Sequence, residues 1–161
     1  MSFFQVTRAL PGNVVSALIN FTAPIGLAVQ FDPTKPSSFG EMTAEFKKAS
    51  GTRGFFLERE VLTEIPLENS VFFKAYVTPE KVGNRVTARA AQEVIVEGLD
   101  LVQTSGTGAI AANTAVNTEL SFNLGRLRQK QSGEEVVGWL REQITPEDAA
   151  NITRIRVELA Q

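Results

Sequence analysis

Short runs in which apolar and polar residues alternate recur along most of this chain, and Gly or Pro separates many of them. In the last such run, Ile155, Val157 and Leu159 take alternate positions and charged residues take the positions between them. Because successive side chains of a β-strand point to opposite faces, this pattern predicts half-buried strands. The predicted strands cover residues 13–20, 26–31, 55–61, 71–77, 85–90, 93–97, 119–122, 126–130, 135–144 and 152–159.

Many short strands with almost no helical periodicity predict a mainly-β fold, a small antiparallel β-sandwich or barrel. Two segments lie outside the strand pattern. Residues 1–8 form an N-terminal arm with an apolar tip, which either packs on its own domain or reaches a neighbouring subunit. Residues 32–54 form one long polar loop, with one or two helical turns over 41–48. A connection of this length is uncommon in compact domains, so it is either a functional contact region or a surface loop without a role.

A stretch rich in Gly, Ala and Thr, residues 104–115, is the best candidate for a boundary inside the chain. It separates a β-rich region over 1–100, which holds the arm and the long loop, from a C-terminal β unit over 101–161. A chain of 161 residues with 43% hydrophobic content suits a single domain with a sizeable core. We therefore expect the two regions to pack together as one domain.

Composition argues against several classes of function. Without Cys, the chain has no disulfide, thiolate nucleophile or Cys-ligated metal. Without His, it lacks the usual acid–base group near neutral pH, so neither a Ser-His-Asp nor a Cys-His catalyst is possible from this chain alone. A net charge of -2 gives no basic surplus for nucleic acid. We expect no cofactor, no bound metal and no direct binding of nucleic acid.

The sequence also predicts no association with a membrane. Charged residues, Gly and Pro interrupt every apolar run well short of the roughly 20 residues that a spanning helix needs. Residues 1–8 lack a basic region followed by an apolar core, so we expect no cleavable secretion signal.

Two features contain residue types that a chemical site would need. Pairs of carboxylates suffice for glycoside hydrolysis, although such pairs are more often solvated surface residues. The segment 104–108, Thr-Ser-Gly-Thr-Gly, has backbone N–H groups for a phosphate but lacks the Gly-Lys-Ser/Thr ending of a phosphate-binding loop. We therefore predict a turn-rich connection there and no catalytic residue in the chain. The carboxylate pairs are Glu58 with Glu60, Glu93 with Glu97, Glu134 with Glu135, and Glu147 with Asp148.

Contacts with other proteins are the role that we expect for the remaining candidate side chains. Three cations of the strand 126–130 fall on one face, and two arginines of the last strand could extend that row. The row is either a solvated face or a docking surface for an acidic protein rim. Trp139 is either an interface anchor or a partly buried core residue. The candidate contact residues are Phe3, Phe4, Arg8, Lys35, Phe39, Arg53, Arg126, Arg128, Lys130 and Trp139.

Three segments resemble small capsid decoration (cement) proteins of tailed bacteriophages. In residues 101–116 a Gly/Ala/Thr stretch leads into a strand, in 132–140 a turn precedes a Val-Val-Gly strand, and 154–159 is a closing strand rich in β-branched residues. In the first hundred residues, the segment 51–57 looks compatible with the β-rich, capsid-bound region of such proteins. The resemblance implies a non-enzymatic virion component, often a trimer, that sits where capsomers meet and reinforces the shell.

We therefore expect a structural protein, not an enzyme, that binds the outer surface of an assembled phage capsid and stabilises it. Its expected partners are the major capsid protein and further copies of itself, most simply as a trimer. Its expected location is the virion, after assembly in the host cytoplasm. Two alternatives stay open: a tail-tube or head-tail connector subunit that assembles into rings, and a carbohydrate-binding or carbohydrate-active β domain that uses carboxylates.

Overall fold

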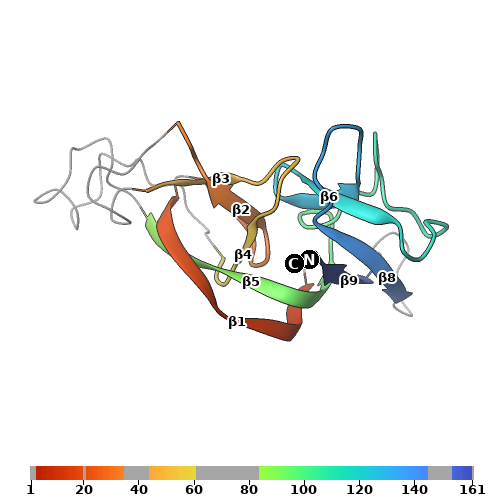
Figure 1. Ribbon diagram of the computed structural model, residues 1–161, viewed down its shortest axis with the longest axis horizontal. Coiled ribbons are helices and arrows are strands. Elements are labelled where there is room, and N and C mark those ends of the chain that lie inside the picture. The colour runs from red at the N-terminus through yellow and green to blue at the C-terminus, as the bar shows by residue number, and fades with distance from the viewer. Residues whose placement is uncertain (1–2, 20, 35–43, 61–83, 145–153, 161) are drawn as a thin grey trace, which may run out of the picture.

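A computed structural model of the chain describes residues 3–19, 21–34, 44–60, 84–144 and 154–160. These residues form strands and no helix, and the strands curl into a half-barrel (Figure 1). The mainly-β fold that the sequence predicts, a small antiparallel barrel or sandwich, is thereby confirmed. The strands are β1 (Phe3–Ile19), β2 (Ala28–Phe31), β3 (Phe46–Lys48), β4 (Phe55–Leu57), β5 (Asn84–Glu97), β6 (Glu119–Asn123), β7 (Arg126–Gln129), β8 (Gly138–Ile144) and β9 (Arg154–Leu159).

All pairs of these strands are antiparallel, and they belong to one nine-stranded sheet. The main path through the sheet is β3-β2-β4-β5-β9-β8-β6-β7, and β1 joins it by pairing with β5. Strands from both sides of residue 100 therefore share one sheet. The two strands predicted over 85–90 and 93–97 are one continuous strand, β5.

Three strands pair with β5, which makes it the centre of the sheet. β1 pairs with β5 on both sides of an irregularity at residues 10–13, whereas β4 pairs with residues 88–89 and β9 with residues 93–96. A strand has only two edges, so β4 and β9 share the edge opposite β1. Between them lies a fork at residues 90–92, which neither strand pairs with in the described part of the chain.

The predicted N-terminal arm is the first part of β1, so it packs on its own domain. Its first residues pair with residues 94–97 of β5. The sequence predicts a break at Pro11-Gly12, but β1 passes through this point because the pairing with β5 shifts between Ala9 and Val14. The glycine there has a φ of 84°, and a bulge also tolerates a proline that cannot donate to the ladder.

The predicted long loop, 32–54, contains β3 where the sequence predicts helical turns. This prediction is wrong for Phe46–Lys48, because Phe46 is buried in the core and its ring centroid lies 5.1 Å from that of Phe31 on β2. A strand of three residues is too short to show an alternating pattern. Residues 44–45 are not helical either, whereas residues 41–43 and the predicted strand 71–77 lie outside the described residues.

Two further predicted strands are shorter in the structure. β4 ends at Leu57, because residues 58–59 form a bend, so the alternation that continues to residue 61 does not produce a longer strand. β8 begins at Gly138, three residues later than the predicted strand 135–144.

Backbone hydrogen bonds hold β2 and the segment after β3 against the hairpin between β6 and β7. The N–H of Ala28 donates to the carbonyl of Gly125 (3.0 Å), and the N–H of Gly125 donates to the carbonyl of Ala49 (2.8 Å). A Cβ at Gly125 would lie 2.7 Å from the Leu27 side chain, so only glycine permits this approach. These bonds join segments that lie far apart on the sheet path, and they fix its curl.

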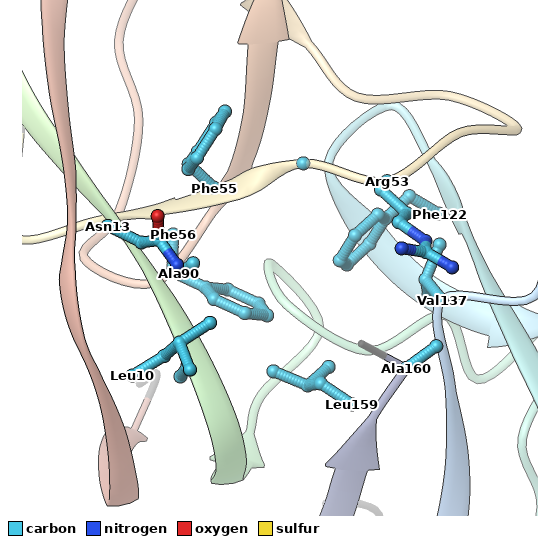
Figure 2. A pocket seen from close by; sticks show the side chains of 12 residues that line it. Leu10, Asn13, Arg53, Phe55, Phe56, Ala90, Phe122, Val137, Leu159 and Ala160 are labelled. Carbon is cyan, nitrogen blue, oxygen red and sulfur yellow. The ribbon is translucent and has the colours of Figure 1, made fainter.

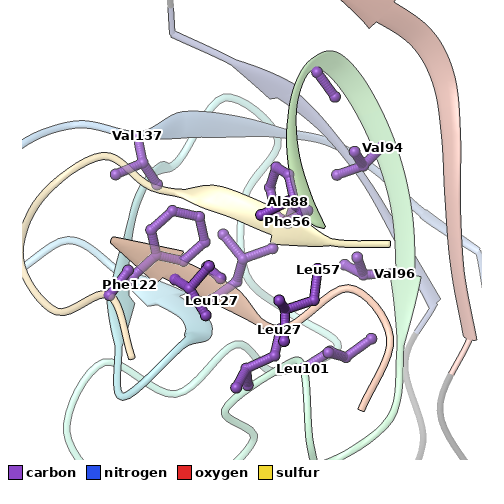
Figure 3. Close-up of a cluster of buried hydrophobic side chains, with 14 of the residues drawn as sticks. Leu27, Phe56, Leu57, Ala88, Val94, Val96, Leu101, Phe122, Leu127 and Val137 are labelled. Atoms are coloured by element: carbon purple, nitrogen blue, oxygen red, sulfur yellow. The ribbon is translucent and has the colours of Figure 1, made fainter. Parts of the chain in front are cut away.

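One hydrophobic cluster fills the inside of the curled sheet (Figure 3). Phe56 of β4 links its parts, because its ring centroid lies 5.3 Å from that of Phe4 on β1 and 5.8 Å from that of Phe122 on β6. The predicted alternation of β9 is confirmed, since Ile155 and Val157 are fully buried and the charged residues between them are not. Apolar residues from both halves of the sequence thus share one core.

Candidate functional site

The three segments that carry the resemblance lie together in the structure. β8 pairs with β9, so residues 132–140 and 154–159 belong to neighbouring strands. The loop after β5 packs on β7 and β8, because Val102 forms a bridge with Leu127 of β7, and the N–H of Asn117 donates to the carbonyl of Leu140 on β8 (2.6 Å). From here on, the C-terminal unit means residues 98–144 and 154–160, which adds the turn after β5 to the described part of the β unit predicted over 101–161.

The Gly/Ala/Thr stretch is held firmly on this unit. The side-chain amides of Gln103, Gln129 and Gln143 donate to carbonyls of residues 105–114 over distances of 2.6–3.1 Å. Ile110 from the middle of the stretch is buried in the core. The predicted turns are present, and side-chain amides from β7, from β8 and from Gln103 of the loop itself anchor them.

The hairpin between β6 and β7 carries an exposed leucine in a strained conformation. Asn123 pairs with Arg126, so Leu124 and Gly125 form a two-residue turn. Both have positive φ, 50° and 83°, as in a type I′ turn. Asn, Asp or Gly usually takes the first position, because the left-handed backbone costs other residues about 1–2 kcal/mol. Leu124 is nevertheless 59% exposed, so packing within this chain covers less than half of its surface.

Two more large apolar side chains of the C-terminal unit are exposed at turns. Leu99 and Val116 are each 58% exposed. Leu99 follows β5, and its carbonyl accepts a hydrogen bond from Arg126 of β7 (3.5 Å). Val116 lies in the loop before β6. With Leu124, the unit presents three apolar side chains that are more than half exposed.

The predicted contact residues of the N-terminal segment are engaged within their own sheet. Phe4 packs on Phe56 in the core. Phe3 lies on the opposite face of β1, where the guanidinium of Arg154 stands 4.2 Å from its ring centroid. Arg8 forms an ion pair with Glu93 (3.1 Å). Side chains on both faces of β1 therefore hold the N-terminal segment on the sheet.

The predicted row of cations on β7 is only partly available for docking. Arg126 and Lys130 are half-buried, and Arg128 forms an ion pair with Glu134 in which both side chains are largely buried. Two strands, β8 and β6, separate β9 from β7. The arginines of β9 therefore do not extend the row.

Glu134 is the more deeply held partner of this ion pair. Its carboxylate also accepts a hydrogen bond from the N–H of Gln131 (2.8 Å). Burial by itself raises the pKa of Glu134, but the hydrogen bonds from Arg128 and Gln131 and the charge of Arg128 outweigh it and lower the pKa. The pair stabilises the turn that precedes β8.

The other predicted contact residues are dispersed. Arg53, just before β4, forms an ion pair with Glu135 (2.8 Å), and its N–H donates to the same carboxylate (3.0 Å). Trp139 is half-buried on β8, with the guanidinium of Arg141 at 5.6 Å from its ring centroid. Lys35 and Phe39 lie outside the described residues.

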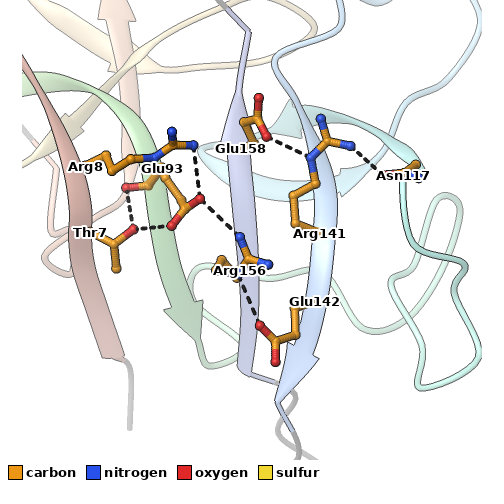
Figure 4. A network of polar contacts seen from close by, with 8 residues as sticks. All are labelled: Thr7, Arg8, Glu93, Asn117, Arg141, Glu142, Arg156 and Glu158. Carbon is orange, nitrogen blue, oxygen red and sulfur yellow. Dashed lines mark hydrogen bonds and ion pairs between the residues drawn. The ribbon is translucent and has the colours of Figure 1, made fainter.

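On the outer face of the sheet, ionic side chains from four strands converge (Figure 4). Glu93 of β5 accepts hydrogen bonds from Thr7 (2.9 Å) and Arg8 (3.1 Å) on β1 and from Arg156 on β9 (3.1 Å). Arg156 also binds Glu142 of β8 (3.1 Å). Burial by itself raises the pKa of Glu93, but these bonds and the charges of both arginines outweigh it and lower the pKa.

The same network resolves a repulsion between two strands. Glu93 lies directly opposite Glu158 of β9, and like charges in such positions destabilise a sheet. Arg141 of β8 binds Glu158 (2.9 Å), while Arg8 and Arg156 bind Glu93. Each carboxylate is therefore bound by an arginine, and the ionic contacts link β1, β5, β9 and β8.

Five of the carboxylates that the sequence groups into pairs are bound by arginines in the structure, among them Glu93, Glu134 and Glu135. Glu58 binds Arg89, and Glu97 binds Arg154 (2.7 Å). Glu147 and Asp148 lie outside the described residues. Within the described ranges, no group of three or more acidic residues is placed to hold a metal ion, and no helix is long and apolar enough to cross a membrane.

A cavity of about 530 Å³ opens at the fork on β5 (Figure 2). Its lining includes Phe55 and Phe56 of β4, Phe122 of β6 and Leu159 of β9, with Arg53 beside them. Aromatic and aliphatic side chains thus surround a space in which one cationic group is present.

The sequence interpretation missed both the exposed turn residues and the cavity. One signal pointed to Leu124: the sequence Asn-Leu-Gly between two alternating runs places a leucine where a tight hairpin favours Asn or Gly. The cavity has no such signal, because residues from separate segments line it. Comparison with protein-family models, curated proteins and solved structures finds no match to this chain.

Proposed function

We propose that this protein binds the outer surface of an assembled phage capsid through its C-terminal unit and stabilises the shell. The observation that carries the proposal is Leu124, an apolar side chain 59% exposed on a left-handed backbone. Strain of this kind persists at sites where function uses it. A capsid protein that covers Leu124 would supply the apolar burial that the isolated chain lacks. Full burial of such a side chain contributes about 1.5–3 kcal/mol, and the exposed part of Leu124 accounts for about 1–2 kcal/mol of it.

The resemblance supports the same proposal, because its three segments belong to the unit that carries Leu99, Val116 and Leu124, and Val116 lies within the first of them. The ionic contacts that link four strands support a structural role, since a protein that reinforces a shell must resist deformation. The partner in this proposal is the major capsid protein, and the protein itself acts as a trimer in the virion. Many bound copies make modest single contacts sufficient.

The pKa directions of Glu93 and Glu134 argue against these two carboxylates as the general acid of a carbohydrate-active enzyme. The general acid of a glycosidase needs a raised pKa so that it holds a proton at neutral pH. The pKa values of Glu93 and Glu134 are lowered instead, and arginines bind both carboxylates. These groups are suited to hold strands together.

The test mixes the purified protein with capsids that lack it and measures cosedimentation and the temperature of capsid rupture. The decisive variant is Leu124→Asn, because Asn tolerates the left-handed backbone and the fold is retained. Loss of the apolar contact should weaken binding at least about tenfold, which corresponds to about 1.4 kcal/mol. Ile25→Ser is the matched control, since Ile25 is also exposed but lies outside the C-terminal unit.

Wild-type protein should cosediment with capsids and raise the rupture temperature, and Ile25→Ser should do the same. A wild-type protein that neither binds nor protects capsids would contradict the proposal. Binding by Leu124→Asn at wild-type strength would remove the C-terminal hairpin as the contact. Rings or tubes formed by the protein alone would favour the tail-tube or connector alternative.

A further inference from the structure

The fork in the sheet leaves a space that no described strand fills. β4 and β9 diverge on one edge of β5 at residues 90–92. Ala90 and Ala91 stand at this point, and their methyl groups are too small to fill the gap. Leu10 and Asn13, from the bulge of β1 on the other edge, line the same cavity. The cavity is therefore a consequence of the branched sheet topology.

The size and the lining of the cavity at the fork suit a small organic molecule. Ligand pockets in proteins measure roughly 300–1,000 Å³ and are mostly apolar, with a few polar groups that orient the ligand. This cavity measures about 530 Å³ and is lined by three phenylalanines, two leucines, a valine and several small residues. Its polar side chains are Asn13 and Arg53, which Figure 2 shows on opposite sides of the apolar residues.

Arg53 is held in place for an anionic group. Its Nε lies 2.8 Å from the Glu135 carboxylate, and its backbone N–H donates to the same group (3.0 Å). A guanidinium carries five N–H donors in a planar fork, so one ion pair leaves terminal nitrogens that match a carboxylate or sulfonate. We propose that the fork cavity binds a small molecule with an aromatic or branched aliphatic body and one anionic group, which Arg53 recognises.

The experiment uses two probes with the same aromatic body. 8-Anilinonaphthalene-1-sulfonate carries an anionic group, and N-phenyl-1-naphthylamine carries none. Both should bind the full chain saturably in fluorescence titrations. Ala90→Phe fills the cavity and should weaken both probes at least about tenfold, whereas Arg53→Gln should weaken the sulfonate about fivefold and leave the neutral probe unchanged.

Ala9→Phe is the matched control, because Ala9 of β1 pairs with Ala91 of β5 but is exposed and does not line the cavity. It should bind both probes like the wild type. Methyl NMR spectra of the wild type provide a readout that needs no variant: the neutral probe should shift the signals of Ala90 and Leu159 and leave those of Leu124 in place.

Three results would overturn the proposal: no saturable binding at millimolar probe, equal weakening by Ala9→Phe and Ala90→Phe, or methyl shifts away from the fork. A sulfonate that binds Arg53→Gln as tightly as the wild type would remove the anionic group from the proposal. Leu99, Val116 and Leu124 do not line the cavity. A failure of probe binding would therefore leave the proposed capsid binding untouched, and a failure of capsid binding would leave the proposed ligand site untouched.

Discussion

The ion pairs on the sheet and the Leu124 hairpin each contain an energetically unfavourable feature, but only the ion pairs offset it within this chain. Glu93 faces a like charge and is partly buried, but hydrogen bonds from Thr7, Arg8 and Arg156 offset both costs. At Leu124 the left-handed backbone is costly, and the side chain stays mostly in water. The contrast teaches that the ion pairs serve the stability of this chain, whereas the hairpin leaves an apolar side chain available for a partner.

The largest loss of folding stability should follow from breaking the ion pair between Arg128 and Glu134. Arg128→Met leaves Glu134 largely buried without its cation, with 12% of its side chain exposed. Breaking a buried pair in this way should cost about 3 kcal/mol and lower Tm by about 6–12 °C. Urea unfolding and calorimetry measure both quantities.

Arg53→Met is the matched control, because the pair of Arg53 with Glu135 is about half exposed. Its loss should cost no more than about 1 kcal/mol, as for other surface pairs. Equal destabilisation by the two variants would show that burial does not distinguish the two pairs.

A smaller loss should follow at the Glu93 network. Glu93→Gln keeps the shape of the side chain but removes the charge that binds Arg8 and Arg156. Hydrogen bonds to charged groups contribute about 1.5–3 kcal/mol, so we expect a loss of about 2 kcal/mol in urea unfolding. Glu142→Gln, with 53% of its side chain exposed, should cost less than about 1 kcal/mol. A larger effect at Glu142 than at Glu93 would contradict the central role of Glu93.

Acid should weaken the same contacts. The pKa values of Glu93 and Glu134 are lowered from 4.5 in the folded state, so near and below this value the unfolded chain binds more protons. Stability from these groups is therefore fully present above pH 4.5 and is lost as the pH falls through their lowered pKa values. Urea midpoints measured from pH 7 downward should decline in this acid range. The double variant Glu93→Gln/Glu134→Gln should decline less, and an unchanged acid profile would count against both carboxylates.

Local patterns were enough to predict most of the described strands and, in β9, the buried face as well. In β9, alternation alone identified Ile155 and Val157 as buried, because each residue's side is set by its position in the strand. The pattern also located β6 and β7 within about one residue. Where an element is regular and half-buried, the sequence contains the necessary information.

Pairing between distant segments could not be predicted in this way. Pro11-Gly12 indicated a turn, yet β5 pairs with β1 on both sides of it and converts it into a bulge. The sequence did not distinguish the three cations at and after β7, but in the structure Arg128 is largely buried in an ion pair with Glu134. The fork on β5 depends on which strands pair with it, and that choice is made by tertiary packing.

The smallest change in folding stability should appear at Leu124, where it separates the cost of the backbone from the role of the side chain. Leu124→Asn places a residue that tolerates the left-handed backbone at the first position of the turn, so it should stabilise the isolated chain by about 0.5–1 kcal/mol. Leu124→Ala removes the same apolar contact but keeps a residue that disfavours this backbone, so Tm should stay near that of the wild type. Both variants should bind capsids about tenfold more weakly than the wild type, because both lack the leucine side chain. A stability gain in Leu124→Asn together with weakened binding would separate folding from function at one residue, whereas destabilisation by both variants would mean that Leu124 serves the fold.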